Sequence, residues 1–504
     1  MKRNSLKLLI LSVLVLFSCT QEDELNTSDN EGGTTVILDK VQSINAINDK
    51  IETALITKEG FDWKKVSAHT LWSAVQHGDN IISIGYGDEG ESFSEEQRSP
   101  RLESIKENIL KIIAENEEKG LERNKETVFE YDVINVMDVK IKSLKTVQAL
   151  LKADNVRYLE PTGYNHFDAQ TRSSSGCNKN GQSINSSHYQ TIAPNNAQVA
   201  WNFYEHNIPQ AWSQSTGAGV TIGLIDTGVS QSQSLLNSGG INDGYSNGRF
   251  VQKFGTFIDS FWWWSNNYDG PHDKCGHGTA MASTIAAPRN DNGMPVGVAY
   301  NANLVAYRAT EDVVLNDYHE RKGVSAALVQ LGNRSDVKII SMSIGYVWSI
   351  GNIRDAVRYA HSKGKLIFAA GGTSTSFTNG FGVIFPASMN ETVAVTGVDD
   401  GPNYDRCETC HSGSKIDFTI IMEGDNDTSK APPVLGFYDG QRRYTGGSSV
   451  ATATTAGIAA LVWSKYPNWS RTQVLNRLKQ SSDLYPNKSS NFGYGNIDAL
   501  QAVQ

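Results

Sequence analysis

The sequence predicts an α/β protein in which a doubly wound parallel sheet follows a small α+β module. Three short apolar runs predict the sheet, at residues 219–225, 337–342 and 365–370. Such runs are typical of parallel strands that are buried on both faces. Residues 353–362, between the last two runs, have a helical pattern. Strands and helices therefore alternate, and this alternation predicts a doubly wound sheet.

The small module is expected within residues 76–172. Its strands are predicted at 81–84, 128–133, 136–141 and 156–161, and its helices at 101–118 and directly after Ser143. The order β-α-β-β-α-β is the ferredoxin-like pattern. Residues 19–75 are expected to form a polar tether and an N-terminal segment, with one helical stretch near 41–57.

Length and charge narrow the class of protein. A chain of 504 residues is long enough for about three domains, and its 39% of hydrophobic residues can form a core. The net charge of −9 argues against a nucleic-acid partner. After the N-terminus, no apolar stretch approaches the length of a membrane-spanning helix.

The N-terminus has the pattern of a targeting segment, predicted at residues 1–18. Basic residues precede an apolar run at 8–17, which is too short to span a bilayer. The run ends in Leu16-Phe17-Ser18-Cys19, which resembles a bacterial lipobox and implies lipidation of Cys19. The acidic residues 20–24 resemble a surface-export tag. We therefore expect an outer-membrane lipoprotein of the bacterial cell envelope, exposed at the surface; an ordinary secretory signal and a solvated tether are the alternatives.

Three short motifs carry the chemistry: Asp226-Thr227-Gly228, Gly276-His277-Gly278-Thr279 and Gly447-Ser448-Ser449-Val450-Ala451. Asp226 follows a predicted buried strand, His277 lies between two glycines, and Ser449 begins a predicted helix at 450–463. Alone, each has an ordinary interpretation as a turn aspartate, a core histidine or an N-cap serine. Together, in the order Asp, His, Ser, they indicate nucleophilic catalysis by a triad.

These motifs resemble those of the subtilisin family of serine proteases. The resemblance implies a subtilisin-like endopeptidase domain over residues 173–504, acting on proteins or peptides. In this family the aspartate orients the histidine, which removes the serine proton, and an acyl-enzyme forms. A lipase-like hydrolase is disfavoured because no Gly-x-Ser-x-Gly elbow surrounds Ser449.

One position departs from the family. Subtilisins have an Ala-Ala-Gly-Asn segment whose Asn side chain stabilises the oxyanion, but this chain has Ala369-Ala370-Gly371-Gly372. The oxyanion donor is therefore expected at Gly372, Thr373, Ser374, Asn379 or the backbone N–H of Ser449. The alternative is a catalytically impaired surface lipoprotein that binds peptides.

The resemblance also implies the substrate contacts. The segment Ser343-Ile344-Gly345 resembles the strand that lines the specificity pocket and pairs with the substrate backbone, and Ala370 and Gly371 are expected beside it. Phe385-Pro386 resembles the turn near the pocket floor, which places Ile384 at its base. Trp262-Trp263-Trp264 is either an aromatic platform or a packed loop.

The module at 76–172 resembles the inhibitory prodomain of subtilisins. The resemblance implies that it caps the enzyme as an intramolecular partner and that an autocatalytic cut falls between about residues 163 and 175. An unrelated α/β binding module is the alternative, because this fold hosts many functions.

Four cysteines remain after Cys19: Cys177, Cys275, Cys407 and Cys410. An even number outside the cytoplasm favours disulfides. A local Cys407–Cys410 pair would leave Cys177–Cys275. Zinc held by Cys275, Cys407, Cys410 and His411 is a second possibility, and a free Cys275 is a third. No cofactor is expected for catalysis. Calcium sites are common in the family, but no loop here is specific enough to assign one.

Overall fold

The computed structural model describes residues 40–57, 60–94, 99–117, 127–166, 176–258, 267–373 and 382–504. From Val41 onward, these residues belong to one compact unit. The predicted signal segment, Cys19, the tryptophan triplet and most of the predicted cleavage region lie outside the described residues.

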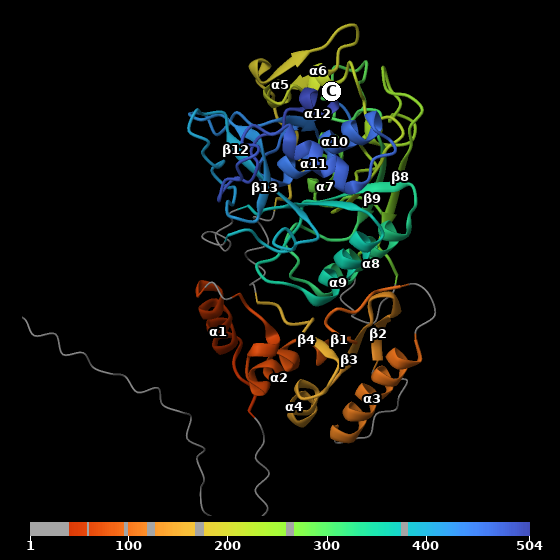
Figure 1. The fold of residues 1–504 in the computed structure, drawn as a ribbon, viewed down its shortest axis with the longest axis vertical. Coiled ribbons are helices and arrows are strands. Elements are labelled where there is room, and N and C mark those ends of the chain that lie inside the picture. The colour runs from red at the N-terminus through yellow and green to blue at the C-terminus, as the bar shows by residue number, and fades with distance from the viewer. Residues whose placement is uncertain are drawn as a thin grey trace, which may run out of the picture. The chain divides into compact units, whose positions relative to one another are not determined.

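A seven-stranded parallel sheet forms the centre of the larger part of the chain (Figure 1). Its neighbouring strands are parallel throughout, which confirms the predicted sheet. The spatial order is β13-β12-β11-β10-β7-β9-β8. The strands are β7 (Thr221–Asp226), β8 (Val251–Gly255), β9 (Asn303–Arg308), β10 (Val337–Met342), β11 (Leu366–Ala370), β12 (Val393–Asp399) and β13 (Ile416–Glu423).

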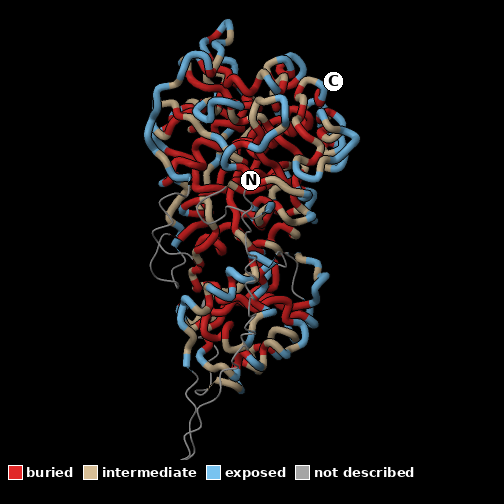
Figure 2. Tube along the Cα trace, turned by 90° about the vertical axis from the view of Figure 1, so that its left-hand side faces the viewer, coloured by how far each residue is buried: buried red, intermediate tan, exposed pale blue. Residues whose placement is uncertain are grey.

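Helices cover both faces of this sheet. One face packs against α5 (Trp201–Glu205), α6 (Ile208–Ala211), α7 (His277–Ala286), α10 (Gly447–Lys465), α11 (Arg471–Gln480) and α12 (Ala499–Val503). The other packs against α8 (Tyr318–Asn333) and α9 (Gly351–Ser362). Strand residues alternate between the two cores: Leu224 belongs to the first and Ile225 to the second. This alternation explains why the strands are apolar on both faces, and Figure 2 shows the buried interior that results.

The order of the strands reverses at one place in the sheet. From β7 the chain adds β9 and β8 on one side and β10 to β13 on the other. The carboxyl ends of β7 and β10 therefore flank the point where the order reverses, which is where open α/β sheets bind ligands. Asp226 is the last residue of β7, and Ser343 directly follows β10.

Two short antiparallel pairs lie outside the main sheet. They are β5 (Tyr189–Thr191) with β6 (Gln198–Ala200), and β14 (Pro433–Leu435) with β15 (Arg442–Tyr444). The second pair matters for the site, because β15 runs directly into the segment that carries Ser449.

Residues 41–166, here called the N-terminal module, contain a four-stranded antiparallel sheet of order β2-β3-β1-β4. The elements are β1 (Ile81–Tyr86), α3 (Pro100–Asn116), β2 (Thr127–Tyr131), β3 (Val136–Lys140), α4 (Leu144–Leu151) and β4 (Val156–Glu160). The predicted ferredoxin-like order is therefore confirmed. Ser143 caps α4 by accepting a hydrogen bond from the backbone N–H of Lys145 at 3.1 Å.

Two further helices pack onto this module, α1 (Ile44–Ile56) and α2 (Ala68–His77). Buried residues of both helices, including Ile47, Ile51 and Leu71, belong to the same core as the module's sheet. The sequence assigned these residues to an N-terminal segment of unknown role and predicted no helix at α2.

The N-terminal module contacts α8 and α9 through buried polar groups. The carboxylate of Glu160 accepts from the backbone N–H of Gly351, the first residue of α9, at 2.9 Å. Arg157 forms an ion pair with Asp355, and both side chains are buried. Tyr318, the first residue of α8, donates its hydroxyl to Asp138 at 2.8 Å. The module thus covers the N-terminal ends of both helices.

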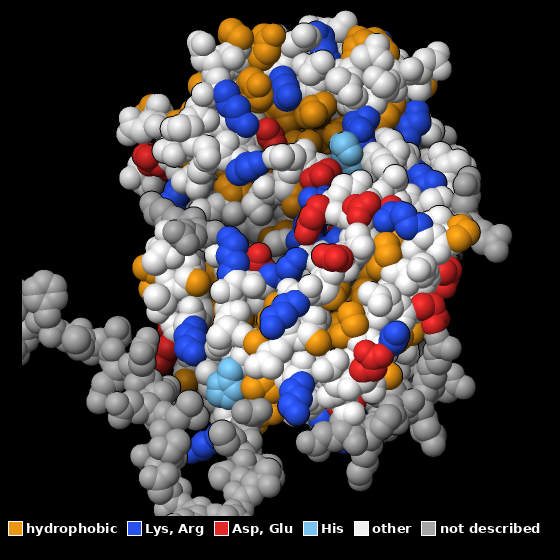
Figure 3. Space-filling model, turned by 60° about the horizontal axis from the view of Figure 1, so that its bottom comes forward, with side chains coloured by type: hydrophobic (Ala, Val, Ile, Leu, Met, Phe, Trp, Pro, Cys, Tyr) orange, Lys and Arg blue, Asp and Glu red, His pale blue; other side chains and the backbone are white. Residues whose placement is uncertain are grey.

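None of the described helices is both long and apolar enough to cross a membrane. On the face drawn in Figure 3, basic, acidic and hydrophobic side chains of the described residues are interspersed.

Candidate active site

Asp226 and His277 form a hydrogen-bonded pair at the end of β7. Nδ1 of His277 donates to Oδ1 of Asp226 at 2.8 Å, and the backbone N–H of Thr227 donates to the same oxygen at 2.8 Å. Asp226 is fully buried, so its carboxylate is shielded from water. Because the carboxylate can only accept, Nδ1 carries a proton, and whenever the imidazole is neutral its lone pair is on Nε2. His277 is therefore oriented as a general base requires.

Ser449 lies in the first turn of α10, half-buried. Its backbone carbonyl accepts from the hydroxyl of Ser343 at 2.9 Å, which holds this turn against the end of β10. Since β10 is the neighbour of β7, the three motifs meet at one edge of the sheet. Among the described residues, no hydrogen bond joins Ser449 to His277; bonds of this type are often long without substrate and tighten in the complex.

The buried carboxylate of Asp273 connects two of the motifs. Its Oδ1 accepts from the Thr227 hydroxyl at 2.9 Å and from the backbone N–H groups of Cys275 and Gly276 at 2.8 Å each. Its Oδ2 accepts from the backbone N–H of Thr279 at 3.0 Å and from the Thr279 hydroxyl at 2.6 Å. Asp273 therefore positions both the turn after Asp226 and the start of the helix that carries His277. Asp273 was not predicted from the sequence, because its only signal there is its place just before the histidine motif.

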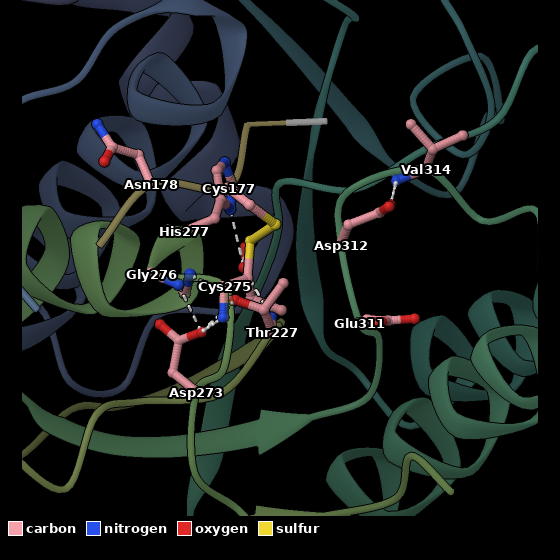
Figure 4. The surroundings of a disulfide bond; sticks show 12 residues. Cys177, Asn178, Thr227, Asp273, Cys275, Gly276, His277, Glu311, Asp312 and Val314 are labelled. Carbon is pink, nitrogen blue, oxygen red and sulfur yellow. Dashed lines mark hydrogen bonds and ion pairs between the residues drawn. A yellow bond between two sulfur atoms is a disulfide. The ribbon is translucent and has the colours of Figure 1, made fainter. Parts of the chain in front are cut away.

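Gly176 and Cys177, at the start of the part of the chain that contains the seven-stranded sheet, lie close to His277. A Cβ built on Gly176 would lie 3.4 Å from Cδ2 of the imidazole. The next residue, Cys177, forms a disulfide with Cys275, two positions before His277 (Figure 4). This is the pairing that the sequence favoured, but the contact of the preceding Gly176 with the imidazole was not predicted, because the disulfide joins residues 98 positions apart.

The position of the missing oxyanion amide is filled by another side chain. Gly372 has a φ of +127°, and a Cβ built there would lie 2.4 Å from Nδ1 of His411. Since this nitrogen is within 3.0 Å of the carbonyl oxygen of Gly382, the ring is held in place. An asparagine at position 372 would therefore need a strained backbone and a displaced histidine.

Two of the remaining oxyanion candidates lie beside the nucleophile motif. The backbone N–H of Gly372 donates to the Ser448 hydroxyl at 3.3 Å, so it is already engaged. The hydroxyl of Thr373 lies 3.1 Å from that of Ser448, one residue before the nucleophile. Ser374 and Asn379 lie outside the described residues. Both Gly372 and Thr373 therefore bond to the residue that precedes Ser449.

Part of the predicted substrate-binding segment, residues 343–345, already makes backbone hydrogen bonds within the chain. The N–H of Gly345 donates to the carbonyl of Val313 at 3.0 Å, and its carbonyl accepts from Leu315 at 3.1 Å. Both backbone groups of Gly345 therefore already bond to residues 313–315, and pairing of the segment 343–345 with a substrate backbone stays a prediction. Ser343 and Ile344 are buried beside it.

The predicted pocket residues do come together around Gly345. A Cβ built on Gly345 would lie 2.6 Å from Cδ1 of Ile384, so the Ile384 side chain packs against this glycine. The N–H of Ile384 donates to the carbonyl of Gly371 at 3.0 Å, next to Ala370 at the end of β11. Ile384 thus lies between the segments that follow β10 and β11.

The second disulfide joins Cys407 to Cys410. A disulfide sulfur is not a thiolate ligand, so the zinc site considered above is not formed by these cysteines. Among the described residues, no group of three or more His, Cys, Asp or Glu side chains is arranged to hold a metal ion.

A family model described as the subtilase family matches residues 217–496, which is more than half of the chain. This chain belongs to the subtilase family. It is accordingly a serine endopeptidase, and its substrates are proteins or peptides.

Relatives of this subtilase support the assignment. Subtilisin E of Bacillus subtilis is 31% identical over 309 residues, 61% of this chain and 71% of that protein. A thermostable alkaline protease of Halalkalibacterium halodurans is 30% identical over 311 residues, 61% of this chain and 74% of that protein. M-protease of Shouchella clausii is 26% identical over 455 residues, 90% of this chain and 97% of that protein.

A solved structure shows the same fold. The crystal structure of fervidolysin from Fervidobacterium pennivorans, a keratinolytic enzyme related to subtilisin, matches with a TM-score of 0.58 at 17% identity. The match covers 84% of this subtilase and 61% of that chain.

Proposed function

We propose that this subtilase cleaves peptide bonds with Asp226, His277 and Ser449 as its catalytic triad. The observation that supports this most is the 2.8 Å bond from His277 to the buried Asp226, at the edge where the Ser449 helix meets β10. The Ser449 hydroxyl oxygen attacks the carbonyl carbon of the substrate while its proton passes to Nε2 of His277. That proton then goes to the leaving amine, and water hydrolyses the acyl-enzyme.

Covalent labelling tests this assignment. The parent chain should react with a fluorophosphonate probe and hydrolyse casein, and Ser449→Ala should do neither. His277→Ala should lose turnover but keep its fold by circular dichroism. A parent that stays unlabelled and inactive would instead support the peptide-binding alternative.

We further propose that Thr373 and the backbone N–H of Ser449 stabilise the oxyanion. The Thr373 hydroxyl lies 3.1 Å from that of Ser448, next to the nucleophile. Loss of an oxyanion donor costs about 10²–10³ in kcat in subtilisin. Thr373→Val should therefore lower kcat by that order with little change in KM, and Thr373→Ser should keep most of the activity. Equal kinetics for Val and Ser variants would exclude Thr373 as the donor.

The N-terminal module is proposed to be an inhibitory prodomain removed by autocatalysis between about residues 163 and 175. Two observations support this. The module covers α8 and α9 with buried hydrogen bonds, and the chain that follows the cleavage region lies against His277 at Gly176. The chain expressed without its signal should cut itself in this region, and Ser449→Ala should remain intact. Cleavage of both proteins would indicate a foreign protease.

The sequence pattern at the N-terminus supports a lipid anchor on Cys19 and attachment to the bacterial outer membrane, facing outward. Labelling with a radioactive fatty acid should mark the parent but not Cys19→Ala. Protease shaving of intact cells should then remove the protein. Resistance to shaving with labelling retained would place the anchored enzyme on the inner side of the membrane.

A further inference from the structure

Residues 176–182, here called the strap, run over the imidazole of His277. The backbone of Gly176 packs on Cδ2 of His277, the ring atom bonded to Nε2. A Cβ built on Gly176 would also lie 3.7 Å from Cγ1 of Val313, so the glycine is close to both side chains. His277 is 6% exposed.

Several bonds hold the strap in this position. Cys177 is bonded to Cys275, and the Asn178 carbonyl accepts from Nη1 of Arg443 at 2.5 Å. The backbone N–H of Gln182 donates to the carbonyl of Arg442 at 2.7 Å. The strap is therefore fixed to β15 as well as to the histidine loop. Figure 4 shows Cys177 and Asn178 beside His277.

The strap lies where a substrate chain must leave the site. Nε2 of His277 has to deliver its proton to the leaving amine, so the residues after the scissile bond must begin next to that nitrogen. Gly176 already occupies the neighbouring ring edge. The strap also lies close to the histidine loop: a Cβ built on Gly276 would lie 2.2 Å from the carbonyl oxygen of Asn178. The strap therefore cannot move closer to this loop to make room for a substrate.

We propose that the strap, held by the Cys177–Cys275 disulfide, determines substrate specificity on the leaving-group side. This inference rests on the triad proposed above. With the disulfide intact, the enzyme cleaves substrates that carry a small group after the scissile bond faster than peptides or proteins that continue there in extended form. Autoprocessing does not remove the restriction, because the cut falls before Gly176 and the disulfide keeps the new N-terminal segment attached.

Two substrates with the same acyl part test this. One ends in an aminocoumarin leaving group, and the other continues for several residues between a fluorophore and a quencher. The double variant Cys177→Ser/Cys275→Ser should raise kcat/KM for the long peptide about tenfold and leave the coumarin substrate within about twofold. Parallel changes on both substrates, or no change on either, would overturn the proposal.

A second measurement covers the case in which the double variant does not fold. Mature enzyme carrying Cys407→Ser/Cys410→Ser retains only the Cys177–Cys275 disulfide. A dithiol reductant converts that disulfide to two thiols and becomes a cyclic disulfide itself. Reduction should then raise the ratio of long-peptide to coumarin kcat/KM about tenfold, and an unchanged ratio would overturn the proposal. If neither substrate is cleaved by the parent enzyme, the proposed triad fails, and the strap proposal with it.

Discussion

Asp273 shows how one buried residue can organise a site that it does not enter. Its carboxylate has only acceptor atoms, and all five of its hydrogen bonds come from donors in the two loops that carry Asp226 and His277. Burial raises the pKa of Asp273, while the bonds from Thr279, Gly276 and Cys275 lower it. These partners fit a side chain that accepts hydrogen bonds at both of its oxygens and donates none.

Asp273→Asn should therefore lower both stability and turnover. The new amide would place its N–H₂ group against backbone N–H donors, and each buried group left unpaired costs about 1–3 kcal/mol. We expect a lower urea midpoint and a lower kcat with KM little changed, measured on the same preparation. Thr279→Ser, which keeps the hydroxyl donor, is the matched control and should stay close to the parent. An Asp273→Asn enzyme with parental kcat would contradict the positioning role.

Gly372→Asn should fail to restore the amide that subtilisins have at this position. The φ of +127° disfavours any side chain, and His411 occupies the space of the Cβ. We expect a lower thermal midpoint and no gain in kcat. Adding His411→Ala provides space but not a favourable φ, so it should recover stability only in part. If Gly372→Asn alone increased kcat, the backbone at residue 372 and the His411 ring would have to rearrange easily.

At the scale of elements, α9 depends on the N-terminal module for its first turn. Glu160 accepts from the N–H of Gly351 there, and Asp355 on the next turn pairs with Arg157. Arg157 also donates to the carbonyls of Tyr86 and Ile134 at 2.9 Å each. Strand β4 is thus connected through one guanidinium to both its own sheet and the neighbouring helix.

The Glu160 contact should make the docking of the module sensitive to pH. Burial raises the pKa of Glu160 from 4.5 to about 7, so docking takes up a proton between these values. The stability from this group is complete below pH 4.5 and is lost as the pH rises through about 7. The urea midpoint of the Ser449→Ala chain should fall over this range. Glu160→Gln should flatten the curve; an identical slope in both proteins would exclude Glu160 as the source.

Breaking the Arg157–Asp355 pair from one side should be costly. Arg157→Met leaves the buried Asp355 carboxylate without this partner, and such changes cost about 3–5 kcal/mol. The double variant Arg157→Met/Asp355→Leu removes both charges and should recover much of that loss. Chemical unfolding of the Ser449→Ala background measures both effects. Equal losses in the single and double variants would mean that packing of the arginine stem, not its charge, stabilises this contact.

At the scale of the molecule, local patterns predicted the sheet and the motifs, and contacts across the chain decided the rest. Asp226, His277 and Ser449 were readable because each lies at the end of one element with its own local signal. The strap was not, because Gly176 meets His277 only after folding. The partner of Gly345 was missed for the same reason. Helix α8 escaped prediction because its first turns are polar, and residues such as Glu320, Arg321 and Lys322 are buried.

The second core contains residues from both the N-terminal module and the peptidase part, including Phe61, whose ring lies 5.1 Å from that of Trp348. Trp348 in turn contacts Tyr346, the residue after Gly345, at 4.4 Å. If the module is removed as proposed, the ring of Trp348 loses its contact with Phe61 and becomes more exposed to solvent. The uncut chain thus keeps these aromatic rings covered, and the proposed removal of the module would expose them next to Gly345.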